Sequence, residues 1–337
     1  PGENGLTGGA QICKVMLDAL EKAGVPVRYN TKAVELIHDE CFNVLGVSCV
    51  TGKHRTNFMT KGGVVLATGG FAGNNAMVGQ YIGPYASRMV VRGAPWATGE
   101  NVRLAEQVMA KMVNMDQFYA GPISPVGHCN PSPLMHAGYG IQLNNQGKRF
   151  VQEHLGQIEK AVGIASLTPD NMSYLLIGQD ADANNNILSS TVNRFAKLGL
   201  HVPQGKTIEE AVKAAGLPVD VVMETVKEYN KAVREGKAAT LNPPYLNDHP
   251  HELKTGPFYM IPAVGGIANT FGGPKIDANA RVVNTEDQPI PGLYAAGAAA
   301  GGIWYRADIS GSQLGGCLVF GRLAARHAAA RAKAQKA

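Results

Sequence analysis

The chain has 337 residues, of which 45% are hydrophobic and 17% are charged, so it can bury the cores of two domains and is not a disordered protein. Its apolar runs, such as those around Val64 and Leu318, are short and interrupted by glycine, whereas a membrane span needs roughly 18 apolar residues. The net charge of +5 comes partly from basic residues that follow Arg322 among alanines, as on a solvated helix. We therefore expect a soluble protein with no transmembrane segment and no nucleic-acid partner.

The first 75 residues predict one helix followed by several strands. Apolar residues recur at helical spacing over residues 12–23, Gly24 closes the helix, and residues 25–29 have the composition of a strand. Further strands are indicated by alternating residues at 33–37, 44–50 and 57–60 and by the apolar run 63–67. This run ends at Thr68-Gly69-Gly70, and the whole segment is typical of an α/β domain.

Beyond Asn74 the chain changes to loops rich in proline and glycine, with scattered helices. Thr207 and Glu210 form a capping box that predicts the start of one helix, and other helices are indicated at 99–112 and 221–233. Strand character returns near Pro262, and a strand at 292–297 and a helix at 312–329 look like the closing elements of the first sheet. We therefore predict a discontinuous first domain, residues 1–75 and 261–337, with a second domain, residues 76–260, inserted into it.

Several segments together, in this order, resemble the fumarate reductase/succinate dehydrogenase flavoprotein family. They lie at residues 33–37, 63–74, 97–100, 144–153, 271–277, 290–297 and 319–324. Residues 301–314 are most similar to tricarballylate-dehydrogenase-like members. The resemblance implies an α/β fold in which a Rossmann-like FAD-binding domain carries an inserted α+β substrate (capping) domain. Arg149 and Glu153 belong to a structural signature of this family and are not expected to take part in chemistry.

Two glycine-rich segments suit a flavin cofactor. A strand that ends in Thr68-Gly69-Gly70 lets the backbone approach a ligand closely. Residues 310–316 precede the last helix, whose free N–H groups and positive dipole end would stabilise negative charge. The resemblance implies that FAD is bound by Val34, Thr68, Gly69, Gly70, Glu100, Gly297, Ala298, Ser312, Gln313 and Leu314. Glu100 stands where the family usually has Asp, and Ala298 replaces a Glu that holds the ribityl chain.

The glycine fingerprint that binds the FAD pyrophosphate is not found after any predicted strand, and Gly5–Ala10 has no strand before it. We therefore expect a second polypeptide, or a detached N-terminal piece, to supply this glycine-rich βαβ unit. A processed chain and a chain that has stopped binding FAD are the alternatives. The five cysteines show no ligand spacing, so neither a metal site nor a disulfide framework is expected. The compartment stays open, with the cytoplasm preferred to the periplasm.

The resemblance also locates a substrate site whose usual arginine and histidine positions are altered. Gln157 stands at the proton-donating Arg, His136 at the Arg of its relay, Asn269 at a His, and Gln313 at an Arg. Neutral amides complement a dicarboxylate poorly, so fumarate is not the expected substrate. The candidate catalytic residues are Tyr259, Arg306, His136 and Tyr305, and the candidate substrate-binding residues are Gln157, Asn269, Trp304 and Tyr139.

Tyr259 is the leading candidate for proton transfer, because it matches in place a tyrosine of related ketosteroid dehydrogenases. Each of these residues also has a structural interpretation. Phe258 and Tyr259 could pack in a core strand, Arg306 could pair with Asp308, and His136 could stabilise a loop. The sequence therefore supports an FAD-dependent dehydrogenase or ene-reductase that acts on a C–C bond beside an activating group. The alternative is a catalytically silent subunit with a role in assembly or regulation.

Overall fold

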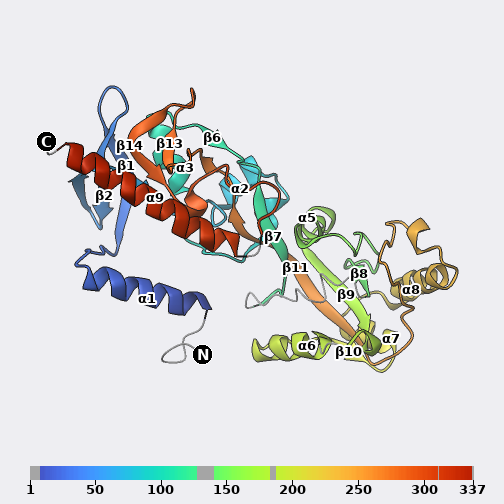
Figure 1. Ribbon diagram of the computed structural model, residues 1–337. Helices are drawn as coiled ribbons and strands as arrows, with labels where there is room; N and C mark the ends of the chain where they lie inside the picture. The colour runs from blue at the N-terminus through green and yellow to red at the C-terminus, as the bar shows by residue number, and fades with distance from the viewer. Residues whose placement is uncertain (1–7, 127–139, 183–186, 310, 336–337) are drawn as a thin grey trace.

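A computed structural model describes residues 8–126, 140–182, 187–309 and 311–335. The elements form two lobes joined by one long strand, β11 (Phe258–Thr270), as Figure 1 shows. The first lobe holds the beginning and the end of the chain, and the second lobe holds much of the middle. Among the described residues, none of the helices is both long and apolar enough to cross a membrane.

The first lobe is built on two small sheets. One is an antiparallel meander of β1 (Thr31–His38), β2 (Val44–Thr51) and β3 (His54–Met59). The other has the order β13 (Arg281–Val283), β14 (Pro289–Ala295) and β4 (Val64–Leu66). β14 runs parallel to β4, with Leu293 opposite Val64, so the early and late parts of the chain share one sheet. Leu36, Leu66 and Leu293 are buried in its core.

The helices of the first lobe differ greatly in how many of their residues are buried. They are α1 (Gly8–Lys22), α2 (Asn75–Tyr81), α3 (Glu100–Ala105) and α9 (Ser312–Ala334). The predicted helix at 99–112 ends early: α3 is followed by a short 3-10 turn, and Met112 already begins β6 (Met112–Val113). β6 pairs with β12 (Gly273–Pro274). α1 has no buried residue, and in α9 only Ala324 is buried.

The second lobe is a mixed sheet with helices on both faces. Its strands are β5 (Val90–Val91), β7 (Phe118–Ile123), β8 (Ile141–Leu143), β9 (Met172–Gly178), β10 (Gln204–Gly205) and β11. Its helices are α5 (Gln157–Leu167), α6 (Ile187–Lys197), α7 (Ile208–Ala214) and α8 (Val219–Arg234). Met260 packs against residues of α7 and α8, whereas its neighbour Ile261 packs with residues of α6, as the alternation of a strand requires.

Local sequence signals account for several of these elements. The capping box is confirmed: Thr207 Oγ1 accepts a hydrogen bond from Glu210 N at 3.2 Å, and Glu210 reaches back to the Thr207 N–H. The predicted strand at 25–29 is wrong, because this segment pairs with no strand. Pro26 lacks a backbone donor, and Val25 and Val27 remain about half exposed.

The domain limits drawn from the sequence remain a prediction, but one contact differs from them. Leu104 and Val108, which the sequence places in the inserted domain, pack in the same core as Leu36 and Leu293.

The structural signature of Arg149 and Glu153 is a buried ion pair. Arg149 and Glu153 have side chains that are only 5% and 2% exposed and form two hydrogen bonds, at 2.8 and 2.7 Å. Glu153 also accepts a hydrogen bond from Gln142 N of β8, so the pair links the segment before α5 to this strand.

Candidate functional site

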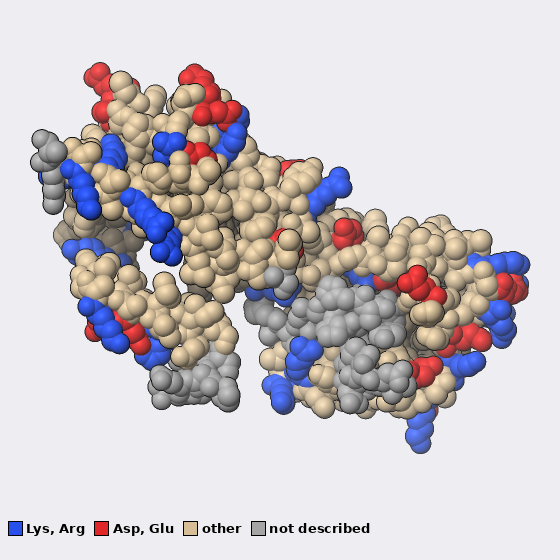
Figure 2. Space-filling model, viewed as in Figure 1, with Lys and Arg blue, Asp and Glu red and all other residues tan. Residues whose placement is uncertain are grey.

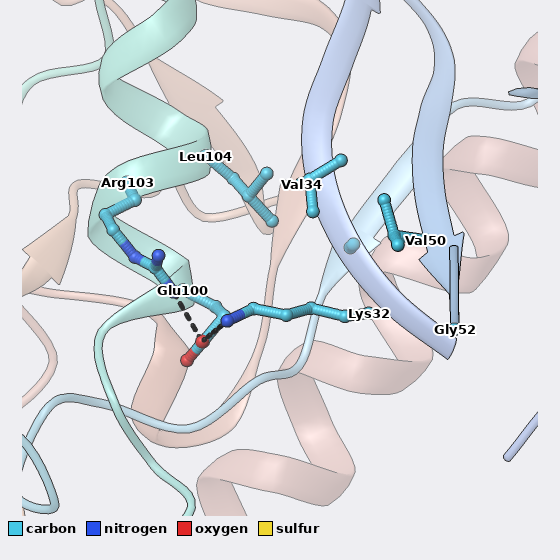
Figure 3. Close-up of a pocket in the computed structure, with 8 residues that line it drawn as sticks. Lys32, Val34, Val50, Gly52, Glu100, Arg103 and Leu104 are labelled. Atoms are coloured by element: carbon cyan, nitrogen blue, oxygen red, sulfur yellow. Dashed lines mark hydrogen bonds and ion pairs between the residues drawn. The ribbon is translucent and has the colours of Figure 1, made fainter. Parts of the chain in front are cut away.

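A pocket of about 430 Å³ lies between β1 and α3. Figure 3 shows its lining, which includes Lys32, Val34, Glu100, Arg103 and Leu104. Val34 and Glu100, two predicted cofactor-binding residues that lie far apart in the sequence, thus line one cavity. Its walls combine apolar side chains with a cluster of charges, as ligand pockets usually do.

A β-bulge explains why Val34 faces this pocket. Ala33 pairs with Cys49 and Glu35 pairs with Ser48, so Val34 has no partner in the ladder. Its displaced backbone is held by a side chain instead: Gln107 Nε2 donates to Val34 O at 3.3 Å, and Gln107 Oε1 accepts from Leu36 N at 2.8 Å. The sequence analysis did not single out Gln107.

Glu100 is the centre of the charge cluster. Its carboxylate accepts a hydrogen bond from Thr98 Oγ1 at 2.9 Å, pairs with Arg103, and lies 3.9 Å from Lys32 Nζ (Figure 3). Burial by itself raises the pKa of Glu100, but the Thr98 hydrogen bond and the two cations outweigh it and leave the pKa below its usual value. The carboxylate is therefore ionised at neutral pH, and its side chain is only 16% exposed.

The glycine turn after β4 is where distant segments of the first lobe meet. A Cβ added to Gly70 would lie 2.1 Å from Thr270 Oγ1 and 3.4 Å from Ala298 O. Thr270 Oγ1 also accepts from Phe71 N at 3.1 Å, and Gly99 N donates to Gly70 O at 3.1 Å. The predicted cofactor residues Gly70 and Ala298 are thus in contact distance, and only glycine fits at this junction. Gly69 is half-buried and Thr68 is exposed beside it.

Helix α9 begins next to this junction. A Cβ on Gly297 would lie 2.9 Å from Cys317 Sγ, which places the turn at Gly297 against the first turns of α9. Ser312 Oγ donates a hydrogen bond to Ile309 O, and the Leu314 side chain is 47% exposed. Gln313 Nε2 is buried but has no hydrogen-bond partner. A buried amide donor without an acceptor points to a ligand oxygen at this place.

The candidate substrate-binding residues Gln157 and Asn269 lie at the start of α5 and on β11, beside β7. Asn269 lies opposite Tyr119 in the antiparallel ladder, so their side chains share one face. Gln157 Nε2 donates to the Tyr119 hydroxyl, and Asn269 Nδ2 is buried without a partner. Gln157 and Asn269 are therefore linked through Tyr119, which the sequence analysis missed.

The loop of Trp304, Tyr305 and Arg306 precedes helix α9. Asn114 Nδ2 donates to Trp304 O at 2.9 Å, and the Trp304 ring lies 3.5 Å from the position of a Cβ on Gly316 in α9. Arg306 does not pair with Asp308; its guanidinium lies over the Tyr305 ring, 5.7 Å from the centroid. Both side chains are exposed, so their proposed catalytic roles stay predictions.

The structure separates Tyr259 from the rest of the predicted site. Tyr259 and Asn269 lie on the same strand, ten residues apart, which corresponds to roughly 30 Å at about 3.3 Å per residue. Tyr259 packs at the edge of the core that contains Phe195, and its hydroxyl faces Gln179 Oε1 at 3.3 Å. The structure therefore does not bring the candidate catalytic residue Tyr259 and the candidate substrate-binding residue Asn269 together, and the role of Tyr259 stays a prediction. His136 and Tyr139 lie outside the described residues.

Comparisons with known proteins identify the family of this chain. The family described as FAD binding domain matches residues 1–314. A cytochrome-type fumarate reductase of Shewanella frigidimarina is 30% identical over 96% of this chain and 55% of its own length. A urocanate reductase of Eggerthella lenta is 29% identical over 97% of this chain and 54% of its own.

Among solved structures, the open conformation of a flavocytochrome c3 fumarate reductase superposes with a TM-score of 0.81. It shares 26% identity over 98% of this chain and 57% of that chain. The chain thus spans about half the length of these relatives. The comparisons confirm the predicted fold class and FAD as the cofactor. The chain belongs to the FAD-binding family of fumarate reductase-like flavoprotein oxidoreductases.

Proposed function

We propose that this chain forms the larger part of an FAD-dependent oxidoreductase that reduces or forms a carbon–carbon double bond beside an activating group. The observation that carries the proposal is the junction at Gly70. There the backbone after β4, Thr270 of β11 and the turn at Ala298 come together. The Tyr119–Gln157 pair lies next to this junction, because Asn269 opposite Tyr119 precedes Thr270 directly.

The residues present fit two parts of FAD. The bulge at Val34 and the pocket of Glu100 would hold the adenosine end, and Gly70, Ala298 and the unpartnered Gln313 Nε2 would hold the flavin ring. When bound, FAD exchanges a hydride with a substrate carbon. The Tyr119 hydroxyl accepts its hydrogen bond from Gln157, so its own proton is free to pass to the neighbouring carbon.

Fumarate is not the proposed substrate. The three family positions that carry charge are occupied by Gln157, Asn269 and Gln313, and an amide cannot balance a second carboxylate. The same three amides favour a catalytically silent subunit as the second candidate. The hydroxyl of Tyr119, held in the site by Gln157, favours an active enzyme.

We also propose that a second polypeptide, or a separate segment, bears a glycine-rich βαβ unit and covers the open side of the first lobe. Large apolar side chains there are exposed on α1, β4 and α9: Ile12, Val15, Met16, Leu17, Leu20, Val65, Leu318 and Val319. Val65 belongs to β4, which pairs in parallel with β14, so this sheet is uncovered at Val65. Figure 2 shows open space between α1 and the rest of the lobe. An exposed patch of this kind marks an association surface.

The proposed activity is tested with the native protein and all its co-purifying chains. FAD content is measured per chain, the flavin is reduced with dithionite without oxygen, and its reoxidation is followed after addition of alkenes that bear a carboxylate, a ketone, an amide or no activating group. Reoxidation by activated alkenes only is expected. A protein whose flavin is reoxidised by none of them is not this kind of enzyme.

The proposed partner is tested on the same preparation. Every co-purifying polypeptide is identified by mass, and the chain expressed alone is compared with the complete preparation for FAD per chain. We expect the isolated chain to associate and to bind little FAD. A monomer of this chain that holds one FAD per chain overturns the partner proposal.

A further inference from the structure

One guanidinium nitrogen in the second lobe, Arg92 Nη1, is buried without a hydrogen-bond partner among the described residues. Arg92 follows β5, and its backbone N–H donates to Ile267 O at 2.7 Å, which places it beside β11. Its Nη1 atom is buried but has no hydrogen-bond partner, and within the described residues Arg92 forms none of the ion pairs. A buried guanidinium nitrogen without an acceptor is costly and is normally paired. The missing acceptor is therefore expected from a ligand.

The surroundings of Arg92 define where that ligand would lie. Its guanidinium carbon is 5.8 Å from the centroid of the Tyr119 ring, which leaves the group stacked on the ring face. A Cβ placed on Gly121 would lie 3.2 Å from Arg92 Nη1 and 3.0 Å from Gln157 Oε1. Nη1 and the Gln157 amide oxygen therefore both lie next to Gly121, which has no side chain of its own.

This place adjoins the proposed substrate side. Tyr119 lies opposite Asn269, whose buried Nδ2 is a second donor without a partner. Thr270, the next residue, contacts Gly70 at the flavin junction. Two unpartnered donors, one of them positively charged, therefore flank Tyr119 and Gln157. The neutral amides beside Arg92 add no second charge.

We infer that Arg92 binds the activating group of the substrate, and that this group is a single carboxylate attached to the double bond. The inference rests on the proposed function, which does not itself name the activating group. A guanidinium and a carboxylate form charge-assisted hydrogen bonds with matched geometry. Arg92 thereby determines specificity for an enoate over a neutral alkene of the same shape.

The experiment uses the native holoprotein and two probes of nearly equal size, acrylate and acrylamide. Binding of each probe is titrated through the change in the flavin absorbance spectrum, without turnover. In Arg92→Gln the apparent Kd of acrylate is expected to rise about tenfold to a hundredfold, as for loss of a hydrogen bond to a charged group. The Kd of acrylamide and the FAD content should stay unchanged. Arg92→Lys keeps the charge and should lose less affinity for acrylate.

Two further readouts separate a ligand-binding role from a structural one. Arg234, an exposed arginine on α8 with a side chain that is 64% exposed, supplies the matched control Arg234→Gln, which should alter neither Kd. Arg92→Met should unfold at about the same temperature as the unaltered protein, because Arg92 forms none of the ion pairs of the described residues and its Nη1 has no hydrogen bond to lose. A clear loss of stability in Arg92→Met assigns Arg92 to the fold and overturns the inference.

The outcomes distinguish this inference from the proposed function. Unaltered protein that binds acrylate no better than acrylamide, or an Arg92→Gln variant that loses both probes equally, refutes the role of Arg92. Turnover of neutral alkenes alone would also refute it while leaving the oxidoreductase in place. Selective binding of acrylate through Arg92 without reoxidation of the flavin by any alkene would instead refute the proposed function.

Discussion

Lys160 should make the stability of this protein depend on pH in the alkaline range. It lies in α5 with only 2% of its surface exposed. Burial lowers the pKa of its ammonium group from 10.5 to about 8, and the nearby Glu153 carboxylate offsets only part of this effect. Between about pH 8 and 10.5 the unfolded chain therefore binds more protons at Lys160 than the folded protein does.

The sign follows from this difference in bound protons. The free energy of unfolding rises with pH through the window, because the folded protein no longer has to bury a charged ammonium group. The interval from 10.5 to about 8 corresponds to about 3 kcal/mol at about 1.36 kcal/mol per pKa unit. Below pH 8 the whole penalty is present, and above pH 10.5 it is absent.

The variant Lys160→Met removes this titration. At pH 7 it should be more stable than the unaltered protein by about 3 kcal/mol, a figure that already includes the attraction to Glu153, and the two should converge near pH 10.5. Urea unfolding at several pH values between 7 and 10.5 measures the difference. Lys227→Met, which removes an exposed lysine on α8, is the control and should leave the pH dependence unchanged. A stability difference that stays constant from pH 7 to 10.5 would refute the reasoning.

Three other substitutions test parts of the structure directly. Arg149→Met leaves the buried Glu153 carboxylate without its main partner and should lower the free energy of unfolding by about 3–5 kcal/mol, measured in urea. Gly70→Ala places a Cβ 2.1 Å from Thr270 Oγ1, so FAD content per chain should fall sharply. Thr207→Ala removes the side-chain half of the capping box and should cost about 1 kcal/mol with FAD content unchanged.

Arg149→Met and Gly70→Ala each have their own control. Adding Glu153→Gln to Arg149→Met should recover part of the loss, and an equal or larger loss in the double variant would contradict the argument from an unpaired charge. Gly79→Ala, where the new Cβ meets Ser87 Cβ at an ordinary 3.6 Å, should keep FAD content unchanged. Full FAD occupancy in Gly70→Ala would show that the junction is not a cofactor contact.

Sequence patterns predicted those elements whose signal is local. The helix before Gly24, the three strands of the meander and the capping box at Thr207 all follow from spacing within a few residues. Residues 25–29 show the limit of such patterns. They have strand composition, but a strand also needs a neighbour to bond with, and the composition does not say whether one exists. The resemblance to a family supplied the cofactor, because ordered motifs survive where single residues change.

The predicted site residues stay a prediction, and the structure brings only some of them together. Motif matching aligned Tyr259 with a catalytic position but did not measure how far a strand carries it from Asn269. Arg92 was missed for the opposite reason. In the sequence it is one arginine before a glycine, and only the fold shows that its Nη1 is buried without an acceptor beside Tyr119. Lack of a partner is a property of packing, which one sequence does not display.

The length of β11 has a mechanical consequence. One strand carries Asn269 and Thr270 at the flavin junction and Tyr259 at the far side of the second lobe, and it is hydrogen-bonded to β7 at one end and to β9 at the other. A small rotation of the second lobe about Thr270 would therefore move its far end much more than the residues near Thr270. A rotation of about 5° about Thr270 moves Tyr259 by about 3 Å and Asn269 by only about 0.3 Å, at a rise of about 3.3 Å per residue. A change in the tilt of the second lobe would therefore move Tyr259 much further than it moves Asn269 and Thr270.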